Sequence, residues 1–169
     1  MEMKQLNEFI KFICIAIRFF KWKLVGFIYT LASLLLERNS VVVFKSELSE
    51  QYGNLQSIIS YWNDHKELHF NLIVANSNVN PLAAIKLIAK AKIIVLDQSN
   101  RYVSNLNLQN KMIVIQCWHG GGLLKKIAYD SHSNRSGREQ KRIARVYRNI
   151  NYIVISDKRY RQIFSEAFR

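Results

Sequence analysis

Among the residues of this sequence, His119 has the type and the surroundings that best suit chemistry. The histidine follows the apolar run "KMIVIQC" and Trp118, and it precedes three glycines and the pair Lys125 and Lys126. A histidine ring titrates close to neutral pH, so it could take a proton from an attacking hydroxyl. Glycines let backbone N–H groups converge on an anion, and a helix expected to begin near Leu123 would point its positive end there. The segment predicts an anion site beside a base, although a strand-end histidine is more often a hydrogen-bonded structural residue.

No cofactor and no metal site is expected. The glycine run matches neither the GxGxxG pattern nor a Walker loop, so dinucleotide and ATP binding are unsupported. His65 and His69 are four residues apart, but the chain is expected to pass from helix to strand between them, and no third ligand is suggested nearby. Cys14 and Cys117 lie in apolar runs without ligand spacing, which predicts reduced, buried thiols.

From residue 40 onward, five apolar segments alternate with helical patterns. Strands are expected over 40–46, 69–77, 92–98, 111–118 and 151–157, and helices over 52–68, 81–91, 137–150 and 158–168. Strands that are apolar throughout and separated by helices predict a mostly parallel, doubly wound, Rossmann-like α/β sheet covered on both faces. In such a sheet ligands bind beyond the carboxyl ends of the strands, which is where residues 118–126 fall.

Residues 1–39 are expected to form an amphipathic helical segment ahead of a domain that spans 40–169. Residues 9–36 are the most apolar part of the chain, but cations interrupt them, and the longest stretch without charge is Leu24–Leu36. A helix that spans a bilayer needs about 20 apolar residues. We therefore expect a helix lying in the headgroup layer, with its cations on anionic lipid. The alternative is a helical hairpin packed on the domain's own core.

The chain is strongly basic, with 25 Lys and Arg against 12 Asp and Glu and a formal net charge of +13. This balance predicts anionic partners, namely phosphates, nucleic acid or an acidic membrane surface. No nucleic acid is expected as the partner, since the aromatic residues lie mainly in apolar segments and no recognised nucleic-acid motif is present. The cations of the expected helix 137–150 could meet phosphates or headgroups on one broad face, or simply be solvated; they are Arg138, Lys141, Arg142, Arg145 and Arg148.

The segment "VIQCWHGGGLLKKIAYDS" resembles the signature of the CDP-glycerol glycerophosphotransferase family, the polymerases and primases of teichoic acids. In that signature a Gln-x-Trp-His motif at a strand end is followed by a glycine-containing loop, Lys-Lys and a short helix. Three further segments are similar to strands and helices of the family, so the likeness covers residues 40–168; they are "VVVFKSELSEQYGNLQSIISYW", "IAKAKIIVLDQ" and "NYIVISDKRYRQIFSEAF".

The resemblance implies a GT-B type fold of two facing Rossmann-like domains. It also implies an activity: transfer of a polyol phosphate from CDP-glycerol or CDP-ribitol to a lipid-linked polyol phosphate acceptor, at the cytoplasmic face of the membrane. The motif histidine, His119, is then the catalytic base, with Gln116 and Trp118 in support. The phosphates of the acceptor are expected to meet Gly120, Gly121, Gly122, Lys125, Lys126, Arg138, Arg142 and Arg145.

The likeness is to the N-terminal half of the family. Family members carry a second domain that binds the CDP-linked donor, whereas this sequence ends at Arg169, near where that domain would begin. We therefore expect the acceptor-side half of a split or truncated enzyme; the alternative is a noncatalytic membrane module that holds an anionic polymer. Many members have Gly-Thr-Pro after the histidine where this sequence has Gly-Gly-Gly-Leu-Leu. Glycerol phosphate and ribitol phosphate both stay open as the transferred group.

Overall fold

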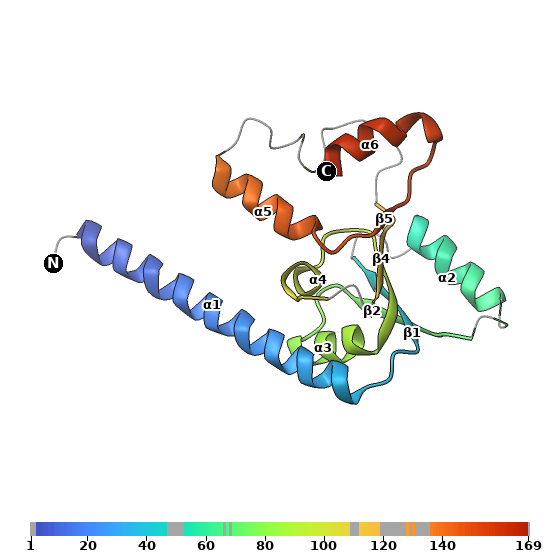
Figure 1. The fold of residues 1–169 in the computed structure, drawn as a ribbon, viewed down its shortest axis with the longest axis horizontal. Helices are drawn as coiled ribbons and strands as arrows, with labels where there is room; N and C mark the ends of the chain where they lie inside the picture. Colours follow the sequence, from blue (N-terminus) through green and yellow to red (C-terminus); the bar gives the residue numbers. More distant parts are fainter. Residues whose placement is uncertain are drawn as a thin grey trace.

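A five-stranded parallel sheet forms the centre of the molecule (Figure 1). The structure, a computed structural model, describes residues 3–46, 53–65, 67, 69–108, 112–118, 128, 130 and 136–168. The strand order is β2-β1-β3-β4-β5, with bounds Ser40–Lys45 (β1), Asn71–Asn76 (β2), Ala91–Leu96 (β3), Ile113–Gln116 (β4) and Tyr152–Ile153 (β5). All four neighbouring pairs are parallel. The doubly wound, Rossmann-like sheet and its five strands, predicted from the apolar segments, are confirmed.

β1 lies inside the sheet and is buried on both faces. Val42 and Phe44 join the core cluster on one face, whereas Val41 and Val43 join the cluster on the other, because successive side chains of a strand point to opposite sides. None of the four is more than 1% exposed. A run of apolar, mostly β-branched residues is what such a strand needs, since neither face meets water.

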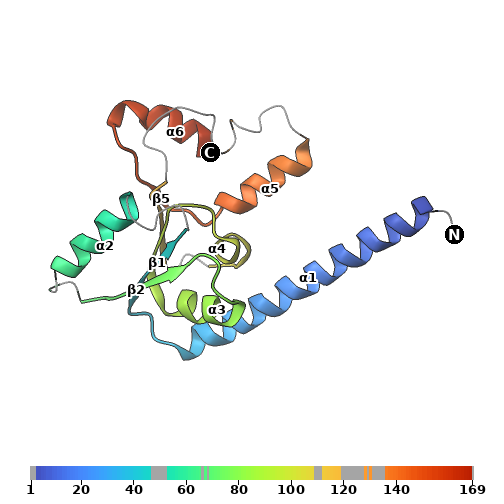
Figure 2. The same ribbon diagram turned by 180° about the vertical axis from the view of Figure 1, so that it is seen from behind.

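Helices cover both faces of the sheet, as the alternating pattern predicts (Figure 2). The face of Val42 and Phe44 is covered by α1 (Met3–Leu35), α3 (Pro81–Lys90) and α4 (Arg101–Asn105), and the opposite face by α2 (Asn54–Asp64). The start of α3 is fixed locally: Asn80 Oδ1 accepts a hydrogen bond from Ala83 N at 2.9 Å, and Pro81 occupies the first turn.

α1 is one uninterrupted helix, and the two ends of it differ in their surroundings (Figure 1). Near its carboxyl end, Val25 and Tyr29 are buried in the main core, whereas Phe12 and Phe20 are each 69% exposed. The hairpin alternative is therefore not what residues 3–35 form. In the part of the chain that the structure describes, no helix has both the length and the apolar character needed to cross a membrane.

The prediction that Cys14 is buried was wrong, because Cys14 is exposed on α1. An apolar run indicates burial only where the element that carries it packs against something, and this part of α1 extends away from the sheet (Figure 1). Cys117 is buried, as predicted, and both cysteines are free thiols.

Residues 136–168 complete the fold with α5 (Gly137–Tyr147), β5, the 3₁₀ turn η3 (Lys158–Tyr160) and α6 (Arg161–Phe168). α5 lies beside α4, and the two are joined by polar contacts: Arg148 donates to the carbonyl oxygen of Leu106 at 2.9 Å, and Ser104 Oγ donates to that of Val146 at 3.1 Å. Arg148 therefore satisfies a carbonyl just past the end of α4, which gives this cation a structural role.

Candidate functional site

The end of β4 brings the chain to the carboxyl edge of the sheet just before the signature histidine. Gln116 pairs with Leu96 of β3, and the carbonyl oxygen of Leu96 accepts a hydrogen bond from Cys117 N at 2.6 Å. Trp118 is the last residue of this stretch that the structure describes. The predicted base His119, the three glycines, Lys125 and Lys126 lie outside the described residues, as does the helix expected near Leu123.

The backbone turns sharply at Trp118. Its φ is 52°, in the left-handed region that a bulky residue seldom adopts. The indole ring packs edge-on against Phe168 of α6, with ring centroids 5.9 Å apart, and it belongs to a cluster with Phe164 and Ala167. An unusual backbone conformation of this kind persists where the surroundings hold it in place, and such positions concentrate at functional sites.

Asn54 of α2 also holds this turn, and the sequence did not predict it as a site residue. Its Nδ2 donates to the carbonyl oxygens of Cys117, at 2.8 Å, and Trp118, at 3.2 Å. Asn54 is the first residue of α2, and Gly53 before it has a φ of 117°, which favours glycine. The pair Gly-Asn at the start of a helix after β1 was the available signal, but nothing local says that this amide reaches a residue 63 positions later.

Gln116 is completely buried, and core packing does not explain its amide. It is 0% exposed, and neither amide atom has a hydrogen-bond partner among the described residues. Leaving a buried polar group unpaired costs about 1–3 kcal/mol, and buried amides are paired in the large majority of cases. The stability of the sheet therefore gives no reason for a glutamine at this position.

Cys117 lies close to the signature histidine in the sequence, but its thiol is not a good nucleophile. Burial, and secondarily the negative charge of Asp97, raise the pKa of the thiol from 9.0 to about 11. The thiolate is the nucleophilic form of cysteine, so a thiol with this pKa is unreactive at neutral pH. Any base or nucleophile at this edge must therefore come from another residue.

The predicted phosphate-binding cations Arg142 and Arg145 lie elsewhere, in an open groove between α1, α4 and α5. Both line a hollow of about 960 Å³ together with Arg18 and Lys23 of α1, and Arg148 lies at its border with α4. α1 also contributes the large apolar side chains of the lining: Ile15, Phe19, Trp22 and Phe27. Of Arg138 only the backbone, in α5, is described. The structure thus gathers the α5 cations with those of α1, not with Gln116 and Trp118.

Metal ligands do not gather in the described part of the chain. No group of three or more His, Cys, Asp or Glu side chains in residues 3–46, 53–65, 67, 69–108, 112–118, 128, 130 and 136–168 is placed to hold an ion. His65 instead stacks on Tyr61, with centroids 3.8 Å apart, and its Nδ1 lies 2.8 Å from the carbonyl oxygen of Tyr61.

The chain matches a known family of transferases over nearly its whole length. The model of the family described as CDP-glycerol:poly(glycerophosphate) glycerophosphotransferase matches residues 12–169. The teichoic acid glycerol-phosphate primase of Bacillus subtilis (strain 168) is 27% identical over 99 residues, which are 57% of this chain and 26% of the primase.

Solved structures of a teichoic acid enzyme resemble this chain in fold. A variant of the wall teichoic acid polymerase TagF soaked with CDPG superposes with a TM-score of 0.66 at 17% identity, and a second variant with a TM-score of 0.64 at 16% identity. Each match covers 99% of this chain and 45% of the TagF chain. At these identities the likeness establishes the fold alone. The chain spans less than half the length of each of these relatives.

Proposed function

The chain belongs to the CDP-glycerol:poly(glycerophosphate) glycerophosphotransferase family, and from that membership we propose that it is the acceptor-side half of a polyol phosphate transferase. The donor is CDP-glycerol or CDP-ribitol, and the acceptor is the terminal hydroxyl of a lipid-linked polyol phosphate. The TagF chains are about twice the length that this chain matches, so we assign the donor site to a second unit.

The transfer needs a base, a fixed acceptor and relief of charge on the leaving group. The acceptor oxygen forms a bond to the phosphorus that carries the polyol, and the bond from that phosphorus to the CMP oxygen breaks. His119 takes the proton from the acceptor hydroxyl, and CMP leaves with the electron pair. Holding the reactants in line contributes much of the rate, and we assign to the glycines and lysines of residues 120–126 the role of offsetting the charge that develops.

The observation that carries this proposal is the way the chain is held directly before His119. Leu96 fixes Cys117 N, Asn54 binds the carbonyl oxygens of Cys117 and Trp118, and Phe168 packs on the Trp118 ring. These contacts hold Cys117 and Trp118 at the carboxyl edge of a doubly wound sheet, where such folds bind ligands. Preorganisation of this kind is what a catalytic base requires.

Incorporation of labelled donor tests the proposal. We expect radiolabelled CDP-glycerol or CDP-ribitol to be incorporated into a lipid-linked glycerol phosphate primer by this chain on anionic vesicles, when a separately expressed donor-binding half is added. The two donors, assayed in parallel, decide which polyol phosphate is transferred. If vesicles and primer are bound but neither donor is incorporated, with or without the second half, the chain is the noncatalytic polymer-binding module instead.

We further propose that α1 holds the protein on the cytoplasmic face of the membrane as a peripheral element. Large apolar side chains are exposed along the part of α1 that extends from the sheet, among them Phe9, Phe12, Ile17 and Phe20. Lysines and an arginine lie between them, and the α5 cations face the same groove. A helix with these two features binds in the headgroup layer through apolar burial and attraction to anionic lipid.

Replacing Phe12 and Phe20 together with glutamate is expected to lower binding to anionic vesicles by tenfold or more, since two buried apolar anchors become repelled charges. Cosedimentation with vesicles of phosphatidylglycerol and phosphatidylcholine measures the change. Tyr61→Glu combined with Asn63→Glu is the matched control, because it also adds two negative charges, at exposed positions of α2 on the far side of the sheet. Equal loss in both variants would show that net charge governs binding and that α1 is not the anchor.

A further inference from the structure

A polar pocket opens at the carboxyl edge of the sheet, separate from the groove of α1 and α5. It has a volume of about 340 Å³ and is lined by Ser46 after β1, residues 76–78 at and after the end of β2, and residues 98–101 after β3. This volume lies at the lower end of the range of roughly 300–1,000 Å³ found for small-molecule sites. The pocket therefore has room for a small molecule.

The pocket lies where the topology of the sheet favours a ligand. The strand order β2-β1-β3-β4-β5 means that the chain goes from β1 to β2 on one side and then returns to β3 on the other side of β1. The loops after β1 and β3 therefore diverge, and this switch point is the common ligand position of doubly wound sheets. The segment Asp97–Arg101 leaves β3 directly beside the segment that leads from β4 to the signature.

Hydrogen bonds within and between the strand ends hold the residues that line the pocket. Ser46 Oγ donates to Asp97 Oδ2 at 2.5 Å, and both residues are less than 9% exposed. Ser77 N donates to the carbonyl oxygen of Lys45, and Asn78 N donates to Asn76 Oδ1, both at 2.8 Å. The three strand ends are thus fixed to one another, so the lining is built in advance of any ligand.

The side chain of Asn100 has one hydrogen-bond donor that is not used within the described part of the chain. Its Oδ1 accepts from Tyr102 N, at 2.9 Å, and from Val103 N, at 3.2 Å, and so caps α4. Its Nδ2 is buried without a hydrogen-bond partner in the described part of the chain, and the residue is only 2% exposed. A buried amide donor that lines a pocket and lacks a partner indicates an acceptor on a bound molecule.

The side chains that line the pocket indicate which chemical groups the bound molecule carries. Seven of the eight lining side chains are neutral amides or hydroxyls, which both donate and accept and so suit hydroxyl groups. The remaining one is Arg101, whose guanidinium is held over the Tyr102 ring at 4.9 Å and donates to the Tyr102 hydroxyl at 3.0 Å. Arginine suits phosphate. Among the described residues, no aromatic side chain lines the pocket for a nucleobase to stack on, and no carboxylate lines it to hold a cation.

We propose that this pocket binds one phosphorylated polyol unit, with its hydroxyls on the amides of residues 76–78 and 98–100 and its phosphate on Arg101 and Asn100 Nδ2. That the unit is the end of the acceptor chain rests on the proposed function, whereas the binding of a polyol phosphate does not. Because Cys117 N donates to the carbonyl oxygen of Leu96, a unit bound here would lie near the strand end from which the chain continues into the signature.

Titration of the full chain with glycerol 3-phosphate tests the pocket without any transfer reaction. We expect saturable shifts of the amide signals of Asn76, Asn78, Gln98 and Asn100 in ¹⁵N-correlated NMR spectra at millimolar ligand. Glycerol and inorganic phosphate, titrated separately, are each expected to bind at least tenfold more weakly. No saturable shift with glycerol 3-phosphate would overturn the pocket, and equal binding of inorganic phosphate would overturn the polyol assignment.

Two variants locate the ligand. Arg101→Gln is expected to weaken glycerol 3-phosphate by about tenfold, as expected for loss of a charge-assisted hydrogen bond. Asn100→Asp keeps the oxygen that caps α4 but replaces the donor with a charge that repels phosphate, so we expect a similar loss. Asn80→Asp is the matched control, because Asn80 caps α3 in the same way outside the pocket, and it should bind normally. Unchanged binding in both pocket variants, whose spectra also report whether they fold, would overturn the site.

The transfer assay tests the proposed function and the titration tests the pocket, so a negative result in one experiment does not decide the other. Binding of glycerol 3-phosphate without incorporation of donor would leave the pocket in place and remove the proposed transfer. Incorporation without binding would remove the pocket and leave the transfer.

Discussion

Replacement of His119 by alanine is expected to lower kcat for transfer by roughly 10²- to 10⁴-fold, the usual contribution of a positioned general base. KM for the primer should change little, because the acceptor's phosphates are assigned to other residues. The rate that remains would come from the alignment of donor and acceptor, which the substitution leaves intact. Steady-state incorporation of labelled donor into primer measures kcat and KM, and single-turnover incorporation, with the protein in excess over donor, measures the rate constant of the chemical step.

The matched control for this variant is His69→Ala. His69 is exposed just before the amino end of β2 and therefore lies at the opposite edge of the sheet from Trp118. It should retain full activity. Partial recovery of the His119→Ala rate by added imidazole would identify a missing base, whereas a rate within about threefold of the unaltered chain would contradict the catalytic assignment.

A loss of folding would imitate a loss of catalysis, so stability has to be measured beside activity. His119 follows a turn that Asn54 and Phe168 hold through other residues. Because these contacts do not involve the His119 side chain, the free energy of unfolding should change by less than about 1 kcal/mol in His119→Ala. If the transfer rate and the urea midpoint of unfolding both fall in His119→Ala, the loss of activity reflects a loss of folding and does not support His119 as the base.

The sequence was a good guide to the sheet because the strands are apolar on both faces. In β1 and β3 almost every residue meets the core, so burial and β-branching coincide in one short run, as in "VVVF". α4 was not predicted, because its five residues carry no helical period. Its position depends on Asn100 as a cap and on the burial of Tyr102 and Val103 by neighbouring elements, and no local pattern contains those contacts.

The candidate site was predictable only where its residues are adjacent in the sequence. Trp118 and the glycines form a dense local pattern, and a titratable ring beside them attracts attention. Asn54 and Asn100 are ordinary polar residues in their own segments. They become parts of a site because the parallel strands bring the loops after β1, β2, β3 and β4 to one edge. That arrangement comes from the pairing of strands, which the sequence pattern left undetermined.

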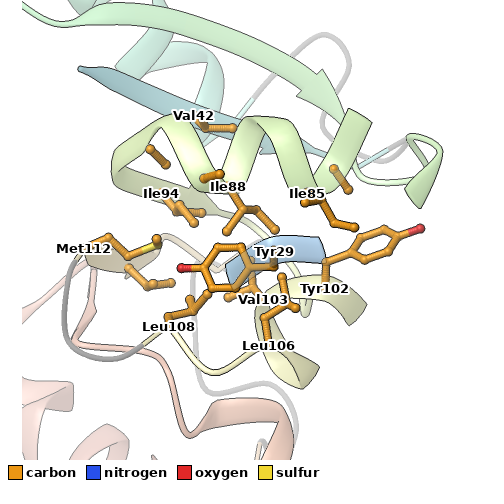
Figure 3. Packing of buried hydrophobic residues seen from close by; sticks show 14 of the residues in the cluster. Tyr29, Val42, Ile85, Ile88, Ile94, Tyr102, Val103, Leu106, Leu108 and Met112 are labelled. Atoms are coloured by element: carbon orange, nitrogen blue, oxygen red, sulfur yellow. The ribbon is translucent and has the colours of Figure 1, made fainter. Parts of the chain in front are cut away.

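Tyr29→Ala is expected to lower the free energy of unfolding of the domain by about 3–5 kcal/mol, the range for truncating a buried aromatic residue. Tyr29 belongs to α1, within the segment 1–39 that the sequence suggested as a membrane-associating unit. Its ring is nevertheless 4% exposed and lies in the core with Ile88, Val103 and Leu106 (Figure 3). Its removal leaves a cavity between α1 and the helices that cover the sheet.

Phe27→Ala is the control that makes this result interpretable. Phe27 is an aromatic residue two positions earlier on the same helix, but it is 61% exposed, so its truncation should change stability by no more than about 0.5 kcal/mol. Urea unfolding followed by tryptophan fluorescence, without vesicles, measures both. A large loss in Tyr29→Ala alone would mean that the carboxyl-terminal part of α1 is a structural element of the α/β domain. Two equally small losses would mean that α1 detaches from the core in solution and acts only at the membrane.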